Sequence, residues 1–542
     1  MKRKKIIILI AAITVNSFFA KAQVIDEARY LIDNEKYQSA ESLLEKFAGA
    51  ISDEPEASNL LIKTYFEQDK KEEAKQFIKT RLLPAISNTS NPLEKVAYAR
   101  YLLGTGNKPA ADDIFTSLLN DKKNQKNASL LMAMAEVYID EEAGDPKMAI
   151  EWLNMAEKRD KNNPQADILK GLAYRRIPDA TNAFLAYTAA LKKDPGNVRA
   201  HYLIGKIFTA QKNPDVYMEH FQKAYQTDSS YAPVLEELYN HYYYRDVRLA
   251  KKYLEEFIVH ADYSLRHEYY LTDILYLNGE YANAIRAAKG IIAKIGDESQ
   301  PRLYKLIAYS YAKSGDSAQA LPAIKQYFEK EEPAKTIAAD FELRARLTER
   351  ISGTEDAVIS YYTIAFEMDT LAQNKARYAA KIAALYKQAD NQSQLAIWLG
   401  KLYQWKAKPT NVDLFNWGLA HYTARDYKAT DSVFGLYVSR YPNDIYGYYW
   451  RAQANAAIDT SMNEALAVPY YIKVVEIGEE NINANTKMLL KAYGYLGGYE
   501  ANITKDYTKS LMWFEKYLSL DAGNEDIAGY VETLKKWIEN KK

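Results

Sequence analysis

The chain contains no cysteine among its 542 residues, and histidine occurs only six times. The lack of cysteine excludes disulfides, cysteine-held metal sites and a thiol nucleophile. No His-Glu-x-x-His metal motif, phosphate-binding glycine loop with its lysine, or Gly-x-Ser-x-Gly elbow occurs. The sequence therefore predicts no catalytic residue, no metal ligand and no cofactor, and we expect a protein that is not an enzyme.

Glycine and proline are also modest, at 22 and 16 residues, so long low-complexity linkers are not prominent. Aromatic residues make up 13% of the chain, and tyrosine alone supplies 46 of them. Disordered chains are poor in aromatic residues because they bury little apolar surface. The composition therefore predicts a folded chain over most of its length.

Only the first 22 residues stand apart in composition. Lys2, Arg3, Lys4 and Lys5 precede a largely apolar stretch from Ile6 to Ala20. Ala20-Lys21-Ala22 then places small residues at the two positions that a signal peptidase reads. The sequence predicts a cleaved secretory signal over residues 1–22, with an uncleaved anchor as the alternative. Because no cysteine follows, we do not expect a lipoprotein.

Cleavage would change the balance of charge. The whole chain has 71 basic and 71 acidic residues, and the leader holds five basic residues and no acidic one. The rest therefore has 66 basic and 71 acidic residues, a net charge of −5. A mildly acidic, exported chain is a poor candidate for nucleic-acid binding. No later segment is apolar enough to predict a membrane span.

The clearest positive feature is an internal repeat between Pro164 and Asp228. A strong turn signal, Asp194-Pro195-Gly196-Asn197, separates its two copies. A fixed period of this length indicates a repeat architecture. Gly171, Tyr174, Ala183, Tyr187 and Ala190 are followed, each after 34 residues, by Gly205, Phe208, Tyr217, Phe221 and Ala224.

The residues of each copy suit a pair of packed helices. Ala183, Tyr187 and Ala190 follow the i, i+4, i+7 spacing that places side chains on one helix face. Small residues at Gly171 and Ala183 allow two helices to approach closely, and the aromatic residues fill the space beside that contact. One such helical hairpin cannot bury its apolar face alone, so we expect neighbouring copies to stack.

At these residues the chain resembles the tetratricopeptide repeat (TPR) family. That family has a small residue at repeat position 8, an aromatic residue at 11, alanine at 20 and 27, a large apolar residue at 24 and proline at 32. The resemblance implies an all-α, right-handed superhelical solenoid of helix-turn-helix repeats. The matching residues are Gly171, Tyr174, Ala183, Tyr187, Ala190 and Pro195.

The same pattern recurs about 14 times between residues 24 and 540, and a charged segment from Glu525 to Asn540 is expected to cap the last repeat. Position 8 is Ala, Gly or Thr in 12 repeats, and position 20 is Ala in 10. Position 8 holds Ala28, Ile62, Ala99, Ala135, Gly171, Gly205, Leu238, Thr272, Ala308, Ala345, Ala383, Gly418, Ala452 and Ala492. Position 20 holds Ala40, Ala74, Ala111, Ala149, Ala183, Tyr217, Ala250, Ala284, Ala320, Ala357, Leu395, Thr430, Ala467 and Ser510. Position 24 of the last five repeats is expected at Tyr361, Leu399, Phe434, Tyr471 and Phe514.

Proline-containing stretches divide this array. The candidate bends are the stretch from Glu329 to Asp340 around Pro333 and the stretch from Trp405 to Asn411 around Pro409, and we use the first to separate two sub-arrays. We therefore expect a signal peptide over residues 1–22, an N-terminal TPR array over 23–333, and a C-terminal TPR array with its capping helix over 334–542.

The resemblance also implies a binding groove. In TPR proteins the first helix of each repeat lines the concave face, chiefly through positions 2, 5, 9, 12 and 13. Here these positions predict a basic, tyrosine-rich groove suited to an extended ligand that carries carboxylates. The alternative is that the tyrosines pack between helices and the basic residues are solvated. The predicted groove residues are Arg175, Arg176, Arg199, Tyr202, Lys206, Tyr243, Arg266, Tyr269, Tyr276, Arg302, Lys305 and Tyr309.

The signal and the resemblance together predict a periplasmic TPR scaffold of a diderm bacterium. It would bind a protein or peptide partner of the cell envelope, in envelope assembly or secretion. An alternative is a glycan-binding or polysaccharide-export accessory protein, with stacking surfaces at Tyr446, Tyr448, Tyr449 and Trp450. SusD-like glycan binders are normally lipoproteins, however, and this chain has no cysteine. A third alternative is an adaptor that assembles end to end.

Overall fold

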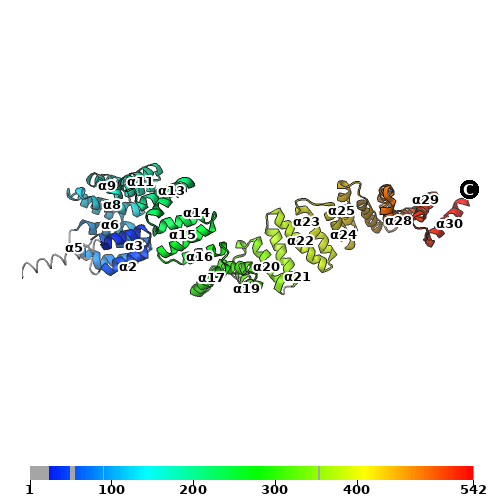
Figure 1. The fold of residues 1–542 in the computed structure, drawn as a ribbon, viewed down its shortest axis with the longest axis horizontal. Coiled ribbons are helices and arrows are strands. Elements are labelled where there is room, and N and C mark those ends of the chain that lie inside the picture. Colours follow the sequence, from blue (N-terminus) through cyan, green and yellow to red (C-terminus); the bar gives the residue numbers. More distant parts are fainter. Residues whose placement is uncertain (1–22, 49–54, 89–90, 352–353, 541–542) are drawn as a thin grey trace, which may run out of the picture. The chain divides into compact units, whose positions relative to one another are not determined.

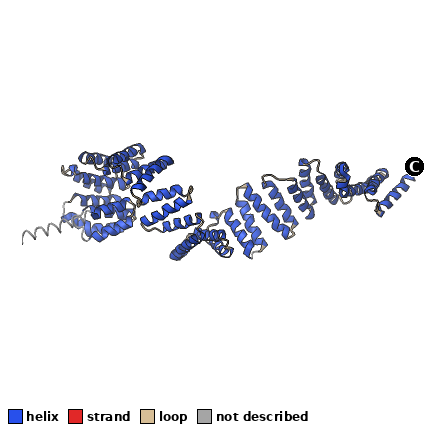
Figure 2. Ribbon diagram, viewed as in Figure 1, coloured by secondary structure: helices blue, strands red, loops and turns tan. Residues whose placement is uncertain are grey.

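The computed structural model describes residues 23–48, 55–88, 91–351 and 354–540. These residues form helices joined by short turns, with no strand among them (Figure 2). Consecutive helices pack in pairs, and within each of the two units described below neighbouring pairs pack on one another. The predicted all-α solenoid of helix-turn-helix repeats is confirmed. The predicted signal over residues 1–22 lies outside the described residues. Within the described part, no helix combines the length and the apolar character that a membrane crossing requires.

Contacts divide the chain into two compact units, residues 1–299 and 300–542, which we call the N-terminal unit and the C-terminal unit. The N-terminal unit runs from blue to green in Figure 1. It consists of a helix over residues 23–33, α2 (Tyr37–Ala48), α3 (Pro55–Glu67), α4 (Lys71–Phe77), η1 (Ile78–Leu82), α5 (Leu83–Asn88), α6 (Pro92–Gly104), α7 (Lys108–Leu119), η2 (Asn124–Lys126), α8 (Ala128–Asp140), α9 (Pro146–Arg159), α10 (Pro164–Arg176), α11 (Ala180–Lys193), α12 (Val198–Ala210), α13 (Pro214–Thr227), α14 (Ala232–Tyr242), α15 (Val247–His260), α16 (Leu265–Leu277), α17 (Tyr281–Ile295) and η3 (Gly296–Glu298).

The C-terminal unit runs from green to red in Figure 1 and ends in the predicted capping helix, α30. It consists of α18 (Pro301–Lys313), α19 (Ser317–Lys330), η4 (Pro333–Lys335), α20 (Ala338–Ile351), α21 (Glu355–Met368), α22 (Ala372–Gln388), α23 (Gln392–Trp405), α24 (Asn411–Thr423), α25 (Tyr427–Arg440), α26 (Ile445–Ile458), α27 (Val468–Gly478), η5 (Glu479–Asn481), α28 (Ile482–Tyr499), η6 (Glu500–Thr504), α29 (Tyr507–Leu520) and α30 (Glu525–Glu539).

This division lies one repeat before the bend predicted at Pro333. The short turn η4 contains Pro333, and α19 and α20 pack against each other across it. The proline therefore shapes a connection between two neighbouring repeats that stay in contact.

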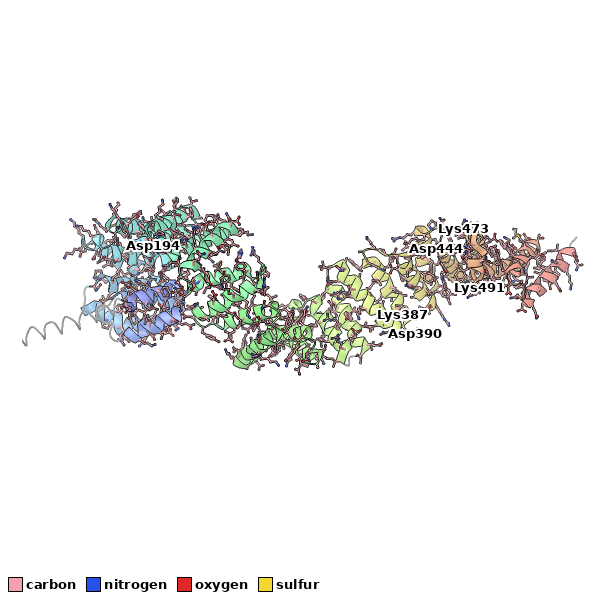
Figure 3. All side chains as sticks on the ribbon, viewed as in Figure 1. Asp194, Lys387, Asp390, Asp444, Lys473 and Lys491 are labelled. Carbon is pink, nitrogen blue, oxygen red and sulfur yellow. The ribbon has the colours of Figure 1, made fainter. Side chains whose placement is uncertain are left out.

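Polar caps set the beginnings of many helices, and they recur with the repeat. Asp179 caps α11 by accepting a hydrogen bond from the backbone N–H of Asn182 at 3.0 Å, and Asn197 caps α12 through Ala200 at 3.0 Å. Each side-chain oxygen satisfies a backbone donor that has no partner inside the helix. Figure 3 labels Asp194 after α11, and Lys387 and Asp390 near the end of α22.

In the fifth, sixth and twelfth repeats, the predicted contact between a small and a large residue is present. A Cβ atom placed on Gly171 would overlap the ring of Tyr187, and one on Gly205 would overlap the ring of Phe221. On Gly418 it would lie 2.5 Å from the ring of Phe434. The absence of a side chain at position 8 is what lets the aromatic residue at position 24 lie between the two helices.

Expected positions in three repeats need correction, all in the C-terminal unit. In the tenth repeat Val358 and Tyr362 are buried in place of Ala357 and Tyr361, because α20 has 14 residues where α10 has 13. In the eleventh, Trp398 is buried and Leu399 only partly, since α22 is extended to 17 residues.

The fourteenth repeat also differs from the expected register. Gly497, not Ala492, faces the aromatic ring at position 24: a Cβ on Gly497 would lie 2.7 Å from the ring of Phe514. The carbonyl of Gly497 also accepts a hydrogen bond from the Ser510 hydroxyl at 2.8 Å. The 18-residue helix α28, followed by the π-helical segment η6, moves the contact five residues along the chain.

Candidate functional site

The first and seventh repeats of the N-terminal unit are in direct contact, although about 200 residues separate them. The Tyr231 hydroxyl donates to the Asp33 carbonyl at 3.0 Å, and the Asn34 side chain accepts from the Ala232 N–H at 3.2 Å. Asp262, which follows α15, accepts from the Ser39 hydroxyl at 2.5 Å. We call these three pairs the closure contacts. Figure 1 shows the dark-blue helices α2 and α3 beside the green helices α14 and α15.

Inside the repeats joined in this way lies a cavity of about 450 Å³, which we call the central cavity. Its walls are side chains from the 23–33 helix and the start of α2, from α3, α8, α10 and α12, and from Tyr231. These are mainly the first helices of their repeats. The central cavity therefore lies on the face of the repeats that the resemblance identified as the binding face.

Four of the predicted groove residues line the central cavity together: Arg175, Arg176, Arg199 and Tyr202. Arg199 forms an ion pair with Asp33 at 2.6 Å. Burial alone would lower the pKa of Arg199, but Asp33 and other nearby acids raise it overall. This arginine is therefore committed to holding the first repeat against the sixth.

Arg176 also has partners within the protein, because it hydrogen-bonds to backbone carbonyls. Its guanidinium donates to the carbonyls of Ile139 at 2.6 Å, Glu141 at 2.8 Å and Glu142 at 2.9 Å. These carbonyls lie at the C-terminal end of α8, where a helix leaves acceptors unpaired and favours positive charge. Arg176 thus caps α8 from the next repeat.

Arg175 differs from its neighbours. Its side chain is exposed into the central cavity, and no carboxylate of the described residues lies within ion-pair distance of it. The phenol of Tyr187 lies close to it within the repeat. Arg175 is therefore the predicted groove cation that is available to a ligand.

Five other predicted residues of the N-terminal unit lie away from the central cavity. Lys206 pairs with Glu237, and Tyr269 is buried. Tyr243 packs edge-on to Tyr239, and Tyr276 lies 5.7 Å from Tyr281 between ring centroids. Arg266 lies 3.5 Å from Glu236 and lines a smaller neighbouring cavity of about 250 Å³, which Glu35 and Tyr37 also border.

The remaining three predicted residues belong to the C-terminal unit. Lys305 and Tyr309 both contact Asp340 at 2.8 Å, and the Tyr327 hydroxyl donates to the same carboxylate at 3.1 Å. Asp340 is fully buried, so these side chains compensate an interior charge. Arg302 is exposed on α18.

A buried charge network next to the central cavity was not among the predicted residues. Lys63 lies 2.8 Å from both Glu136 and Asp140, and Arg100 lies 2.9 Å from Asp140 and 3.2 Å from Glu141. Burial would raise the pKa of Glu136, but Lys63 and Arg100 more than offset this effect and hold it at about 2. Most of these residues occupy repeat positions 9 and 13, so the same positional rule applied to repeats 2–4 would have identified them.

Two carboxylates of the central cavity have no such partner. Glu35 and Glu67 are exposed in it, and no cation of the described chain lies within ion-pair distance of either. Burial by the surrounding protein raises the pKa of both carboxyls overall, although the charge of Lys206 lowers that of Glu35 and the charges of Lys63 and Arg100 lower that of Glu67. The cavity therefore presents uncompensated charge of both signs.

The histidines have packing roles where their contacts are defined. Nδ1 of His201 and Nδ1 of His220 are 3.0 Å apart, and Nε2 of His201 contacts the Pro195 carbonyl at 3.2 Å. Burial, together with the proximity of His201, lowers the pKa of His220 to about 4, so the pair is neutral and one ring donates to the other. Over the described ranges, no group of three or more His, Asp or Glu side chains could hold a metal ion.

The stacking surface proposed for a glycan is largely internal. Trp450 packs against Tyr422, with ring centroids 4.9 Å apart, and against Phe434 at 6.2 Å. Tyr446 is 48% exposed. Of the four aromatic residues, Tyr446 alone offers a widely exposed ring, because Tyr448, Tyr449 and Trp450 are partly buried.

Comparison with known proteins adds independent support for the repeat. The sequence model of the family described as tetratricopeptide repeat matches residues 168–232. This match spans the two copies that define the repeat in the sequence. A search of the curated proteins found no match to this chain.

Solved structures similar to this chain include two bacterial TPR proteins and a third bacterial protein, PilF. The C-terminal part of a TPR protein from Cytophaga hutchinsonii is 26% identical, with 48% of this chain and 98% of that one covered and a TM-score of 0.29. A TPR protein from Parabacteroides merdae is 18% identical, with coverages of 46% and 96% and a TM-score of 0.28. PilF from Pseudomonas aeruginosa is 19% identical, with coverages of 41% and 99% and a TM-score of 0.30.

The match over residues 168–232 coincides with Gly171, Tyr187, Gly205 and Phe221, whose contacts build the helix pairs described above. The same small-to-aromatic contact recurs at Gly418 and Gly497 in the C-terminal unit. On the matched sequence at residues 168–232 and the repeated helix pairs, the chain is similar to the tetratricopeptide repeat family.

Proposed function

We propose that this protein is an exported, non-enzymatic scaffold that binds a segment of another protein in the central cavity of its N-terminal unit. TPR folds serve as protein-interaction scaffolds, which supports a protein partner in general terms. The signal-like residues 1–22 support a periplasmic location, and with it a role in envelope assembly or secretion.

The observation that carries this proposal is the exposed guanidinium of Arg175 in the central cavity, which has no acidic partner among the described residues. Arginine provides a planar fork of donors that matches a carboxylate. The predicted groove cations Arg199, Lys206 and Lys305 each have an acidic partner within the chain, at Asp33, Glu237 and Asp340. Reversing those charges would disrupt the fold, whereas Arg175 can be changed without breaking an ion pair.

Site-directed photocrosslinking in cells tests the proposal. A photoreactive residue replaces Tyr202, which lines the central cavity, or Leu185, which is 56% exposed on α11, as a matched surface position. We expect a defined envelope protein to be crosslinked from position 202 and not from 185. The Arg175→Glu variant should lose the adduct while keeping its helical circular dichroism.

The crosslinked species also reports on export. Its chain should begin at Gln23 and should fractionate with the periplasm. Equal adducts from positions 202 and 185, or an adduct that survives Arg175→Glu, would show that the central cavity is not the binding site.

A further inference from the structure

The charges of the central cavity are compensated within the protein at some positions and left open at others. Asp33 is paired with Arg199, Asp140 with Lys63 and Arg100, and Arg176 with the carbonyls at the end of α8. Subtracting these pairs leaves a short set of charges that have no ion-pair partner among the described residues. That set is Glu35, Glu67 and Arg175.

The two acids form one pole. Glu35 follows the 23–33 helix and Glu67 ends α3, so they come from adjacent repeats. Burial is the largest cause of the raised pKa of each carboxyl, and the charge of Glu67 raises that of Glu35 further. The Tyr37 side chain lies beside both carboxylates and hydrogen-bonds to Glu67 without neutralising it. Two uncompensated carboxylates near a phenol ring form a site that favours an ammonium group.

Arg175 forms the other pole. It extends from the last turn of α10, in the fifth repeat, and no ion pair joins it to Glu35 or Glu67. Its five donors suit a carboxylate, and the neighbouring Arg176 is occupied by the end of α8. The positive and negative poles therefore come from different repeats that border the same space.

We propose that the central cavity binds a zwitterionic peptide end: a terminal carboxylate on Arg175 and a lysine-type ammonium on Glu35 and Glu67. The volume of about 450 Å³ suits a few residues rather than a long extended segment. This inference rests on the proposed function and narrows it, because the bound segment must carry an ammonium group as well as a carboxylate. The closure contacts hold the acidic pole in place, since Asn34 and Ser39, on either side of Glu35, bond to the seventh repeat.

The test uses three peptides and the purified full-length protein in calorimetric titrations at low salt. The peptides are Ala-Ala-Lys, its C-terminal amide, and Ala-Ala-norleucine, which removes the side-chain ammonium. Ala-Ala-Lys should bind at least about tenfold more tightly than either of the other two, because each lacks one charge-assisted contact. Raising the ionic strength should reduce this preference.

Variants assign each preference to its pole. Arg175→Gln should weaken binding of Ala-Ala-Lys about tenfold while leaving the amide unaffected, and the Glu35→Gln, Glu67→Gln double variant should remove the preference for lysine over norleucine. Lys192→Gln, at an exposed position on α11 outside the central cavity, is the matched control and should bind like the wild type.

Equal affinity for the three peptides, or no binding of Ala-Ala-Lys, would overturn the zwitterion site. The two proposals fail separately. If crosslinking depends on Arg175 but the peptides do not bind, the scaffold proposal stands and the ammonium site at Glu35 and Glu67 is wrong. If the peptides bind but no protein is crosslinked in cells, the zwitterion site stands and the scaffold proposal is wrong.

Discussion

The two units are built from the same repeat, yet their polar contacts reach over different distances along the chain. In the N-terminal unit the hydrogen bond from Tyr231 to Asp33 joins residues 198 positions apart. In the C-terminal unit, hydrogen bonds between repeats such as that from Lys516 to Glu479 join residues 37 positions apart, about one repeat. Closure of the array is therefore a property of particular turn residues, not of the repeat pattern.

The interiors differ as well. Beside the central cavity the N-terminal unit buries Lys63 and Arg100, with side chains only 6% and 1% exposed. The matching region of the C-terminal unit around α24–α26 is aromatic, with Phe415, Phe434 and Trp450 in mutual contact. Positions 8, 20 and 24 build the fold in both units, whereas the residues facing the concave side decide what each unit can bind.

The largest effect expected from this difference is on stability, at Arg100. Arg100→Met leaves Asp140 with Lys63 alone and removes the ion-pair partner of Glu141 in a buried site, which should cost about 3–5 kcal/mol. Hydrogen exchange followed by mass spectrometry should show faster opening of the N-terminal unit and no change in the C-terminal unit. The method resolves the units separately, which matters because a repeat array need not unfold in one step.

Arg451→Met is the matched variant in the C-terminal unit. Arg451 pairs with Asp431 at 2.8 Å, but the two side chains are 20% and 26% exposed. The free energy of unfolding should therefore fall by only about 1 kcal/mol. Equal losses from the two variants would mean that the buried charges of the N-terminal unit contribute no more than an ordinary pair.

The fold could be predicted because its determinants are local and repeated. Gly171 and Tyr187 lie 16 residues apart in one helix pair, and their relation recurs 34 residues later in Gly205 and Phe221. The predicted register was wrong where the first helix of a repeat is longer than usual: α20, α22 and α28 are longer than α10. One added residue rotates the face that the next helix buries, and no residue type in the sequence indicates where such a residue is added.

The site was predictable only in part. Position rules placed Arg175, Arg176, Arg199 and Tyr202 on one surface, and they do border one cavity. The same rules could not tell that Arg199 would meet Asp33, because that contact depends on closure between the first and sixth repeats. Which charges remain open is a long-range property, and the sequence pattern carries no information about it.

A smaller effect is expected at the closure contacts. Asp262 accepts from the backbone N–H of Gln38 at 2.6 Å and of Ser39 at 3.3 Å, donors in the first turn of α2 that have no partner within the helix. Asp262 thus caps α2 from the seventh repeat, and Asp262→Ala should cost about 1–2 kcal/mol. Amide exchange should rise in α2 and in the segment after α15 together.

The matched variant is Asp426→Ala in the C-terminal unit. Asp426 caps α25 locally, accepting from the Ala429 N–H at 3.2 Å. Its loss should cost about 1 kcal/mol and raise exchange only in α25. If Asp262→Ala likewise affected only its own neighbourhood and left α2 unchanged, the closure contacts would contribute nothing to the stability of the N-terminal unit.

The smallest expected effect is on how stability depends on pH, which should change in opposite directions when buried acids are replaced in the two units. The pKa values of Glu35 and Glu67 are raised by burial, so the folded state binds their protons more tightly than the unfolded state does. Their contribution to stability is therefore lost as pH rises through the raised pKa values. The Glu35→Gln, Glu67→Gln variant should be at least as stable as the wild type at about pH 7, and this advantage, under about 1 kcal/mol, should vanish toward about pH 5.

Glu342 in the C-terminal unit should behave in the opposite way. Burial raises its pKa, but the hydrogen bond and charge of Arg377 more than offset this and lower it overall. Its stabilisation is present above its ordinary pKa and is lost as pH falls, so Glu342→Gln should be less stable at neutral pH and the deficit should shrink in acid. Urea midpoints of each unit, followed by pulse proteolysis at several pH values, measure both variants. The same sign for both would show that the acids of the central cavity are as well compensated as Glu342, and would leave no open charge for a ligand to complete.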